Sequence, residues 1–142
     1  MEVFIASDHR GFHLKQFLKR KFPTFTDLGP NTFNPEDDYN DAAIAVAKRI
    51  KSTPDSFGIL ICGSAIGMSI QANRFKGVRA AIVSDTRTAK LTRAHNNANV
   101  LCLSADVLSP RRAQKLVKLF LATPFSEAER HVRRVNRLDK EA

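Results

Sequence analysis

Short apolar runs alternate with longer amphipathic segments along the whole chain of 142 residues. The apolar runs are 3–6, 24–29, 57–62, 78–84 and 99–105. The segments that follow them are 11–22, 38–52, 67–75, 85–95 and 110–124. Short apolar runs are typical of strands buried on both faces, and the longer segments have the length of helices. Five strand–helix units in succession predict an α/β fold with a five-stranded parallel sheet and helices on both faces.

The longer segments also carry the spacing and the end signals of helices. In 38–52 the small and aliphatic residues recur on one helical face: Ala42, Ala43, Val46, Ala47 and Ile50. Ser109 and Pro110 suit the N-cap and the first position of a helix that Pro124 ends. A last helix is expected over 126–141, and no later segment covers it, so we expect it to pack on a second subunit. No repeat or linker divides the chain, which predicts one domain, 1–142.

Composition excludes several classes of protein. The chain is 43% hydrophobic and 26% charged, as globular proteins are, and no apolar run approaches the roughly 20 residues that span a bilayer. The first residues lack the basic and apolar regions of a secretory signal, so we expect a cytoplasmic protein without a membrane partner. The formal charge of +9 suggests nucleic acid, but no aromatic residues interleave with the basic ones as a base-stacking surface requires. Anionic small substrates explain the charge at least as well.

Neither a metal nor a nucleotide cofactor is indicated. The two cysteines, Cys62 and Cys102, have no second Cys or His at a zinc-binding spacing. Gly67-Met68-Ser69 lacks the lysine of a phosphate-binding loop, and no three-glycine dinucleotide motif follows the first strand. We therefore expect no cofactor and no metal.

Ligands of open parallel sheets bind outside the carboxyl ends of the strands, so polar residues at those ends are the candidate site residues. They are Ser7-Asp8-His9, Cys62-Gly63-Ser64, Ser84-Asp85 and Ser104-Ala105-Asp106. His95 and Asn96 end the fourth helix and so belong to the opposite end of the sheet, unless their loop folds back over it.

Cys62 allows two interpretations. It is either the last buried residue of its strand or a reactive thiol, because the glycines at 63 and 67 let a ligand approach the backbone. The unpaired N–H groups of the helix that follows stabilise anions and can lower the pKa of a thiol.

The other candidates also have plain structural interpretations. Asp8 suits a helix N-cap, and His95 suits a cation at a helix C-terminus. One basic face of the last helix is either solvated or binds phosphate; it comprises Arg130, Arg133, Arg134 and Arg137.

Seven ordered sequence blocks together resemble the ribose-5-phosphate isomerase B family, which includes the galactose-6-phosphate isomerase subunits. The blocks are Ser-Asp-His-x-Gly-Phe-x-Leu-Lys at 7–15, Asp-Tyr at 38–39, Gly-Ile-Leu-Ile-Cys-Gly-Ser at 58–64, Gly-Met-Ser-Ile-x-Ala-Asn at 67–73, Gly-Val-Arg-Ala-Ala at 77–81, Arg-x-His-Asn-x-Ala-Asn-Val-Leu at 93–101 and Arg-His-x-x-Arg-Val at 130–135. The resemblance covers practically the whole chain.

The resemblance implies a Rossmann-like three-layer sandwich that forms a homodimer, or a tetramer of paired dimers, and converts aldose to ketose phosphates through an enediolate. It makes Cys62 the base that moves a proton between C1 and C2, and His95 the group that opens the sugar ring. Ser64 assists the backbone that holds the enediolate oxygens, namely Gly63, Ser64, Ala65, Ile66 and Gly67. The residues implied in binding sugar or phosphate are Asp8, His9, Asn96, Arg130 and Arg134, with the arginines acting across the dimer interface.

The chain departs from the family pattern at several positions. Ser64 and Ala65 stand where the family loop usually has Thr-Gly, and alanine disfavours any positive φ that glycine adopts there. Asp106 stands where the family usually has a basic residue, and Arg10 replaces a small one. A carboxylate cannot bind a phosphate dianion, so we hypothesise that Arg10 supplies the charge missing at 106.

The leading hypothesis is the interconversion of ribose 5-phosphate and ribulose 5-phosphate. The alternatives are the same chemistry on another aldose phosphate, such as a hexose 6-phosphate or a deoxy-sugar phosphate, and a sugar-phosphate-binding protein without catalysis.

Overall fold

The computed structural model describes residues 1–142 and contains the predicted alternation of strands and helices. The strands are β1 (Val3–Ser7), β2 (Thr26–Asp27), β3 (Phe57–Cys62), β4 (Ala80–Ile82) and β5 (Val100–Ser104). The helices are α1 (Phe12–Lys21), α2 (Tyr39–Ser52), α3 (Ile66–Ala72), α4 (Thr86–Ala94), α5 (Pro110–Ala122) and α6 (Glu129–Glu141).

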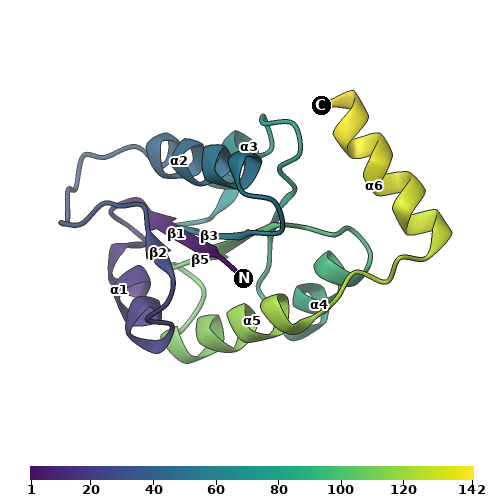
Figure 1. Ribbon diagram of the computed structural model, residues 1–142. Coiled ribbons are helices and arrows are strands. Elements are labelled where there is room, and N and C mark those ends of the chain that lie inside the picture. Colours follow the sequence, from purple (N-terminus) through teal and green to yellow (C-terminus); the bar gives the residue numbers. More distant parts are fainter.

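The five strands form one parallel sheet in the order β2-β1-β3-β5-β4. Helices α2 and α3 cover one face, and α1, α4 and α5 cover the other, as Figure 1 shows. Successive residues of a strand point to opposite faces, so Phe4 packs under α2 while Ile5 packs against the α1 and α5 side. The predicted three-layer fold is confirmed.

Helix α6 stands apart from the three layers (Figure 1). Val135 is its one buried residue, and Leu138 on the same helix is 52% exposed. Three contacts join this segment to the body: Asp139 pairs with Arg79 at 2.9 Å, the His131 ring stacks on His95, and the Ser126 N–H donates to the Ala94 carbonyl at 3.0 Å. Most of the helix therefore lacks a partner within the chain.

Several element boundaries differ from those predicted, and two strands and the last helix show it most clearly. Strands were expected over 24–29 and 78–84, but β2 has two residues and β4 has three. Both are edge strands, paired on one side only, so fewer ladder bonds extend them. Helix α6 begins at Glu129 instead of Ser126, because Glu127 has φ of 57°, which no right-handed helix accommodates.

Several polar residues that the sequence singled out lie at helix N-termini, where they can act as caps. Ser109 caps α5 ahead of Pro110 as predicted, accepting from the Arg112 N–H. Asp85 caps α4 through the Thr88 N–H, which gives this strand-end residue a structural role. Asp8 is not the N-cap of α1, which is Gly11, because the helix begins at Phe12 and Asp8 lies three residues before the cap. None of the helices is both long and apolar enough to cross a membrane.

Candidate active site

The carboxyl ends of β1, β3 and β5 lie side by side, with Cys62 at the middle one. Cys62 is in register with Ser104, and Ser7 with Ile61. Backbone bonds tie the turns beyond these ends together: the Ala105 N–H donates to the Cys62 carbonyl at 2.9 Å, and the Asp8 N–H donates to the Ile61 carbonyl at 3.2 Å. The sheet thus places Asp8, Cys62 and the 104–106 turn at one edge, as predicted.

The Cys62 side chain lies under the turn that follows it. The residue is 4% exposed, and its Sγ accepts the Ala65 N–H at 3.1 Å. Burial raises the pKa of the thiol by more than the Ala65 N–H lowers it, and the negative charge of Asp8 adds a smaller increase. The N–H donors of the turn thus act in the expected direction, but desolvation outweighs them, so the thiol pKa of the chain by itself is raised.

The turn of residues 63–67 adopts a left-handed conformation at Ala65, with φ of 68° and ψ of −3°. Alanine therefore holds the conformation for which glycine is usual, at a cost of about 1–2 kcal/mol. That conformation aims the Ala65 N–H at the sulfur. The Ile66 N–H is also engaged, because it donates to the Ser64 Oγ at 3.2 Å.

Asp8 organises the turn after β1. Its Oδ1 accepts the backbone N–H groups of Arg10 at 2.9 Å and Gly11 at 3.1 Å. Gly11 must be glycine, since a Cβ there would lie 2.3 Å from the Ile61 carbonyl oxygen. Burial raises the pKa of the Asp8 carboxyl although these N–H donors lower it. The close approach of the turn to β3 keeps this carboxyl beside Cys62.

The His9 ring turns away from β3 toward the loop after β2. Asp37 holds it there, because its Oδ1 accepts the His9 backbone N–H and contacts the ring Nδ1, both at 2.8 Å. The Phe33 ring makes a T-shaped contact with the His9 ring, with the two ring centroids 6.4 Å apart. Sequence reasoning missed Asp37, since no motif or spacing links it to His9, 28 residues away.

Arg10 extends the other way, across the end of β3. Its Nη2 lies 2.6 Å from Asp106 Oδ1, and its side chain covers Gly63. The sequence led to the hypothesis that Arg10 supplies the positive charge missing at position 106. In the structure the two side chains form an ion pair with each other.

Tyr39 is a second residue that sequence reasoning left out of the site. Its ring lies against Gly67, where an added Cβ would be 2.4 Å from the Tyr39 Cζ. The Asp38-Tyr39 block was a signal that could have placed it there. The ring forms a wall on the α2 side of the turn.

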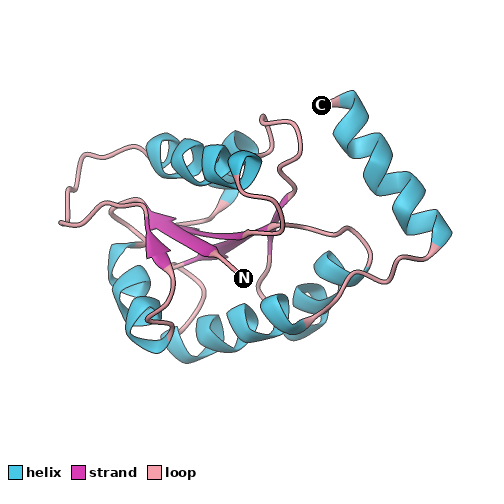
Figure 2. Cartoon of the chain, viewed as in Figure 1, coloured by secondary structure: helices cyan, strands magenta, loops and turns pink.

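Four predicted residues lie far from Cys62 within the chain: His95, Asn96, Arg130 and Arg134. Helix α4 starts at the carboxyl end of the sheet, so His95 at its C-terminus lies at the amino end. The His95 ring stacks on His131 of α6 with centroids 4.3 Å apart. Figure 2 shows the β1 arrowhead pointing away from α6, which carries both arginines. The expectation that His95 lies at the opposite end is confirmed.

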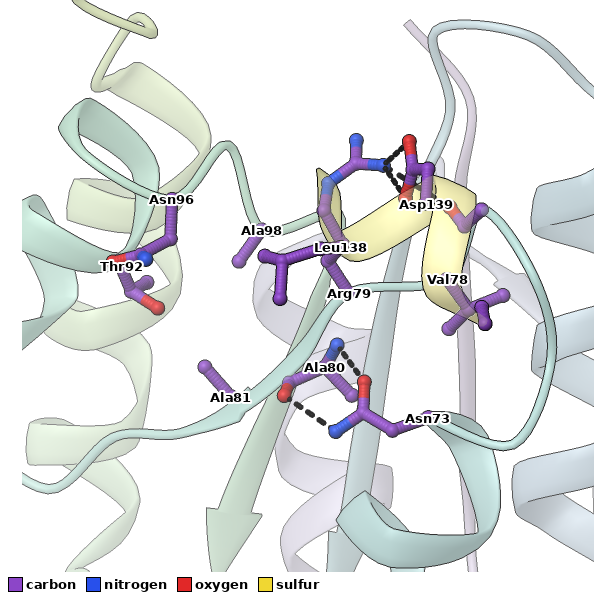
Figure 3. Close-up of a pocket in the computed structure, with 12 residues that line it drawn as sticks. Asn73, Val78, Arg79, Ala80, Ala81, Thr92, Asn96, Ala98, Leu138 and Asp139 are labelled. Atoms are coloured by element: carbon purple, nitrogen blue, oxygen red, sulfur yellow. Dashed lines mark hydrogen bonds and ion pairs between the residues drawn. The ribbon is translucent and has the colours of Figure 1, made fainter. Parts of the chain in front are cut away.

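Asn96 lines a cavity of about 400 Å³ between α6 and the β4 edge. Figure 3 shows Asn96 and Thr92 on one side of it, and the bonded pair Arg79 and Asp139 on the other. Leu138 of α6 points into the space between them.

The chain offers no arrangement of three or more His, Cys, Asp or Glu side chains that could hold a metal ion. The site thus consists of a buried thiol, a carboxyl with a raised pKa, an imidazole and a guanidinium, all at the ends of neighbouring strands.

A polar site at the ends of β1 and β3, where the strand order reverses, defines the class of open α/β proteins that bind a ligand at this switch point. The chain belongs to the Ribose/Galactose Isomerase family, whose sequence model matches residues 3–138.

Similar proteins of known name carry the name of the same family. The chain is 46% identical over 141 residues to the probable ribose-5-phosphate isomerase B of Mycoplasma genitalium, covering 96% of this chain and 92% of the relative. It is 37% identical over 140 residues to ribose-5-phosphate isomerase B of Mycobacterium tuberculosis, covering 96% and 86%.

The fold of the chain is also similar to solved structures of proteins with this name. The crystal structure of ribose-5-phosphate isomerase B from Mycoplasma genitalium with bound ribulose-5-phosphate superposes with a TM-score of 0.94 at 43% identity, covering 99% of this chain and 95% of that one. The enzyme from Thermotoga maritima gives 0.93 at 39% identity, covering 98% and 97%.

Proposed function

We propose that this protein interconverts ribose 5-phosphate and ribulose 5-phosphate, with Cys62 as the base. The observation that carries the proposal is the placement of Cys62 and Asp8 at the switch point of a chain whose relatives are named ribose-5-phosphate isomerase B. In the forward direction the open-chain aldose loses a proton from C2 to the Cys62 thiolate. The C1 carbonyl oxygen takes up charge as the enediolate forms. The thiol returns a proton to C1, and transfer of the O2 proton to O1 leaves the ketose.

The raised pKa of Cys62 affects this step in two ways. A thiolate with a raised pKa is a stronger base toward a carbon acid, and it is also less populated at neutral pH. Catalysis is therefore favoured where a second subunit adds positive charge near the sulfur, which would lower the thiol pKa.

The turn of residues 63–67 would stabilise the enediolate through its backbone N–H groups and the Ser64 hydroxyl. Each such donor is worth roughly 2.7–4 kcal/mol in comparable anion-binding sites. The exposed Ser64 hydroxyl can turn toward the substrate oxygen, and Ile66 and Gly67 supply N–H groups at the start of α3.

The remaining roles divide between two subunits. Asp8, His9 and Arg10 would bind sugar or phosphate at the strand ends of one copy. His95 would open the ring, Asn96 would bind the sugar, and Arg130 and Arg134 would bind phosphate, all from the second copy. The support for a shared site in a homodimer is that these four residues lie at the far end of their own sheet, on or beside the helix with the fewest partners.

The substrate is tested by incubating the purified protein with ribose 5-phosphate, galactose 6-phosphate and allose 6-phosphate and measuring the ketose formed. We expect the highest kcat/KM for ribose 5-phosphate. Conversion of a hexose phosphate alone would reassign the substrate, and conversion of none would overturn the proposal.

The shared site is tested by coexpressing Cys62→Ala and His95→Ala subunits. Each variant by itself carries one defect in every site. Random mixed dimers contain one site with both changes and one with neither, so about a quarter of wild-type activity should return. Activity no higher than that of the single variants would show that each chain builds its own site.

A further inference from the structure

Arg10 and Asp106 meet above the turn that follows β3. Arg10 comes from the turn after β1 and Asp106 from the turn after β5, the two strands that flank β3. The Arg10 side chain lies so close to Gly63 that an added Cβ there would be 2.7 Å from Nε and 2.8 Å from Cζ. The guanidinium is thus in contact with the backbone that is proposed to bind the substrate.

The backbone N–H groups of both residues are hydrogen-bonded to residues just beyond strand ends. The Arg10 N–H donates to Asp8 Oδ1 at 2.9 Å, and the Asp106 N–H donates to the Gly63 carbonyl at 3.1 Å. Asp106 is therefore fixed relative to Gly63, and its carboxylate defines where the end of the Arg10 side chain lies.

The pair adds little to folding, because the Arg10 and Asp106 side chains are 55% and 45% exposed and water screens such pairs. Arginine loses much rotamer freedom when a ligand immobilises it, and holding it beforehand removes that loss from binding. One N–H of Nη2 bonds Asp106. A guanidinium has five N–H donors, so a second edge remains free for two oxygens of an anion.

We propose that Asp106 is a positioning residue, which holds Arg10 above Gly63 so that its free edge binds the phosphate group of the substrate. The inference rests on the proposed function and adds a residue to which the family resemblance gives no such role. It also explains how the carboxylate at 106 is compatible with an anionic substrate, since its charge is matched by Arg10.

The test compares Arg10→Ala, Asp106→Ala and Asp106→Asn, with Arg20→Ala on the far end of α1 as the control for loss of a surface arginine. Arg10→Ala should raise KM for ribose 5-phosphate about tenfold, the effect of a lost hydrogen bond to a charged group. Asp106→Ala should raise KM about fivefold, as expected for one freed side chain, with kcat unchanged. Asp106→Asn keeps an oxygen acceptor and should fall between wild type and Asp106→Ala. In the Arg10→Ala background, Asp106→Ala should add nothing.

Isothermal titration calorimetry with inorganic phosphate compares the phosphate affinity of the same variants without turnover. If no sugar phosphate is converted but phosphate affinity follows this pattern, the proposed function fails and this inference stands. If the enzyme is active and Asp106→Ala leaves KM and phosphate affinity unchanged or improves them, the carboxylate does not position Arg10 and the inference is overturned. A loss that persists in the Arg10→Ala background overturns it as well.

Discussion

The left-handed conformation of Ala65 predicts an unusual response to glycine. In most buried positions Ala→Gly destabilises a protein, but at Ala65 it also relieves the backbone strain that φ of 68° imposes. Ala47, in the middle of α2, is the matched control, because both residues are fully buried in the same core under α2 and α3.

The expected magnitudes follow from three contributions. Loss of a buried methyl costs about 0.8 kcal/mol at either position. At Ala47 glycine costs about 1 kcal/mol more in a helix interior, which gives a total near 2 kcal/mol. At Ala65 the greater freedom of glycine in the unfolded chain costs about 0.4–1 kcal/mol, and relief of the left-handed strain returns about 1–2 kcal/mol. The free energy of unfolding of Ala65→Gly should therefore lie within about 1 kcal/mol of wild type.

Urea unfolding at fixed protein concentration measures both variants, and fixed concentration matters because subunit association contributes to stability. Thermal unfolding should show Ala47→Gly melting about 6 °C below wild type, at about 3 °C per kcal/mol for a chain of this size. Equal losses for the two variants would mean that Ala65 is not held at positive φ, and the account of the turn above Cys62 would fail.

Two further predictions concern charges. Asp27→Asn should lower the free energy of unfolding in urea by about 3–5 kcal/mol, because Lys15 is 0% exposed and bonded to Asp27 at 2.9 Å, so its charge would lose its partner. Lys19→Ala removes the more exposed contact to the same carboxylate and should lower it by under about 1 kcal/mol. Equal losses for the two variants would contradict a buried ion pair. The raised thiol pKa of Cys62 means that the thiolate fraction, and with it kcat/KM, should increase with pH through and above neutrality. Asp8→Asn removes a negative charge that raises this pKa, so the rising limb should move to lower pH; a limb that stays in place would show that another group controls it.

Much of the fold follows from local sequence. Fully apolar strands such as 57–62 and capped amphipathic helices such as 110–122 are specified by their own residues, so their positions were predictable within a few residues. The edge strands were overestimated, because pairing on one side is a tertiary property that the apolar runs at 24–29 and 78–84 do not reveal.

The site was predictable where it depends on strand ends and less so where it depends on loops. Asp8 and Cys62 follow directly from topology. The pairing of His9 with Asp37 and of Arg10 with Asp106 depends on which way exposed side chains turn, across separations of 28 and 96 residues. The net rise of the Cys62 pKa could not be predicted, because the sequence shows the N–H donors of the turn but not the extent of burial.

The proposed mechanism requires that Cys62 removes the proton from carbon. Its most direct test is the initial rate of ribulose 5-phosphate formation by Cys62→Ala, with Cys102→Ala as the matched control, since Cys102 is buried in β5 and has no place in the site. We expect a fall of about 10²–10⁴-fold in kcat for Cys62→Ala and a rate near wild type for Cys102→Ala. A Cys62→Ala variant that is folded and retains the wild-type rate would contradict it.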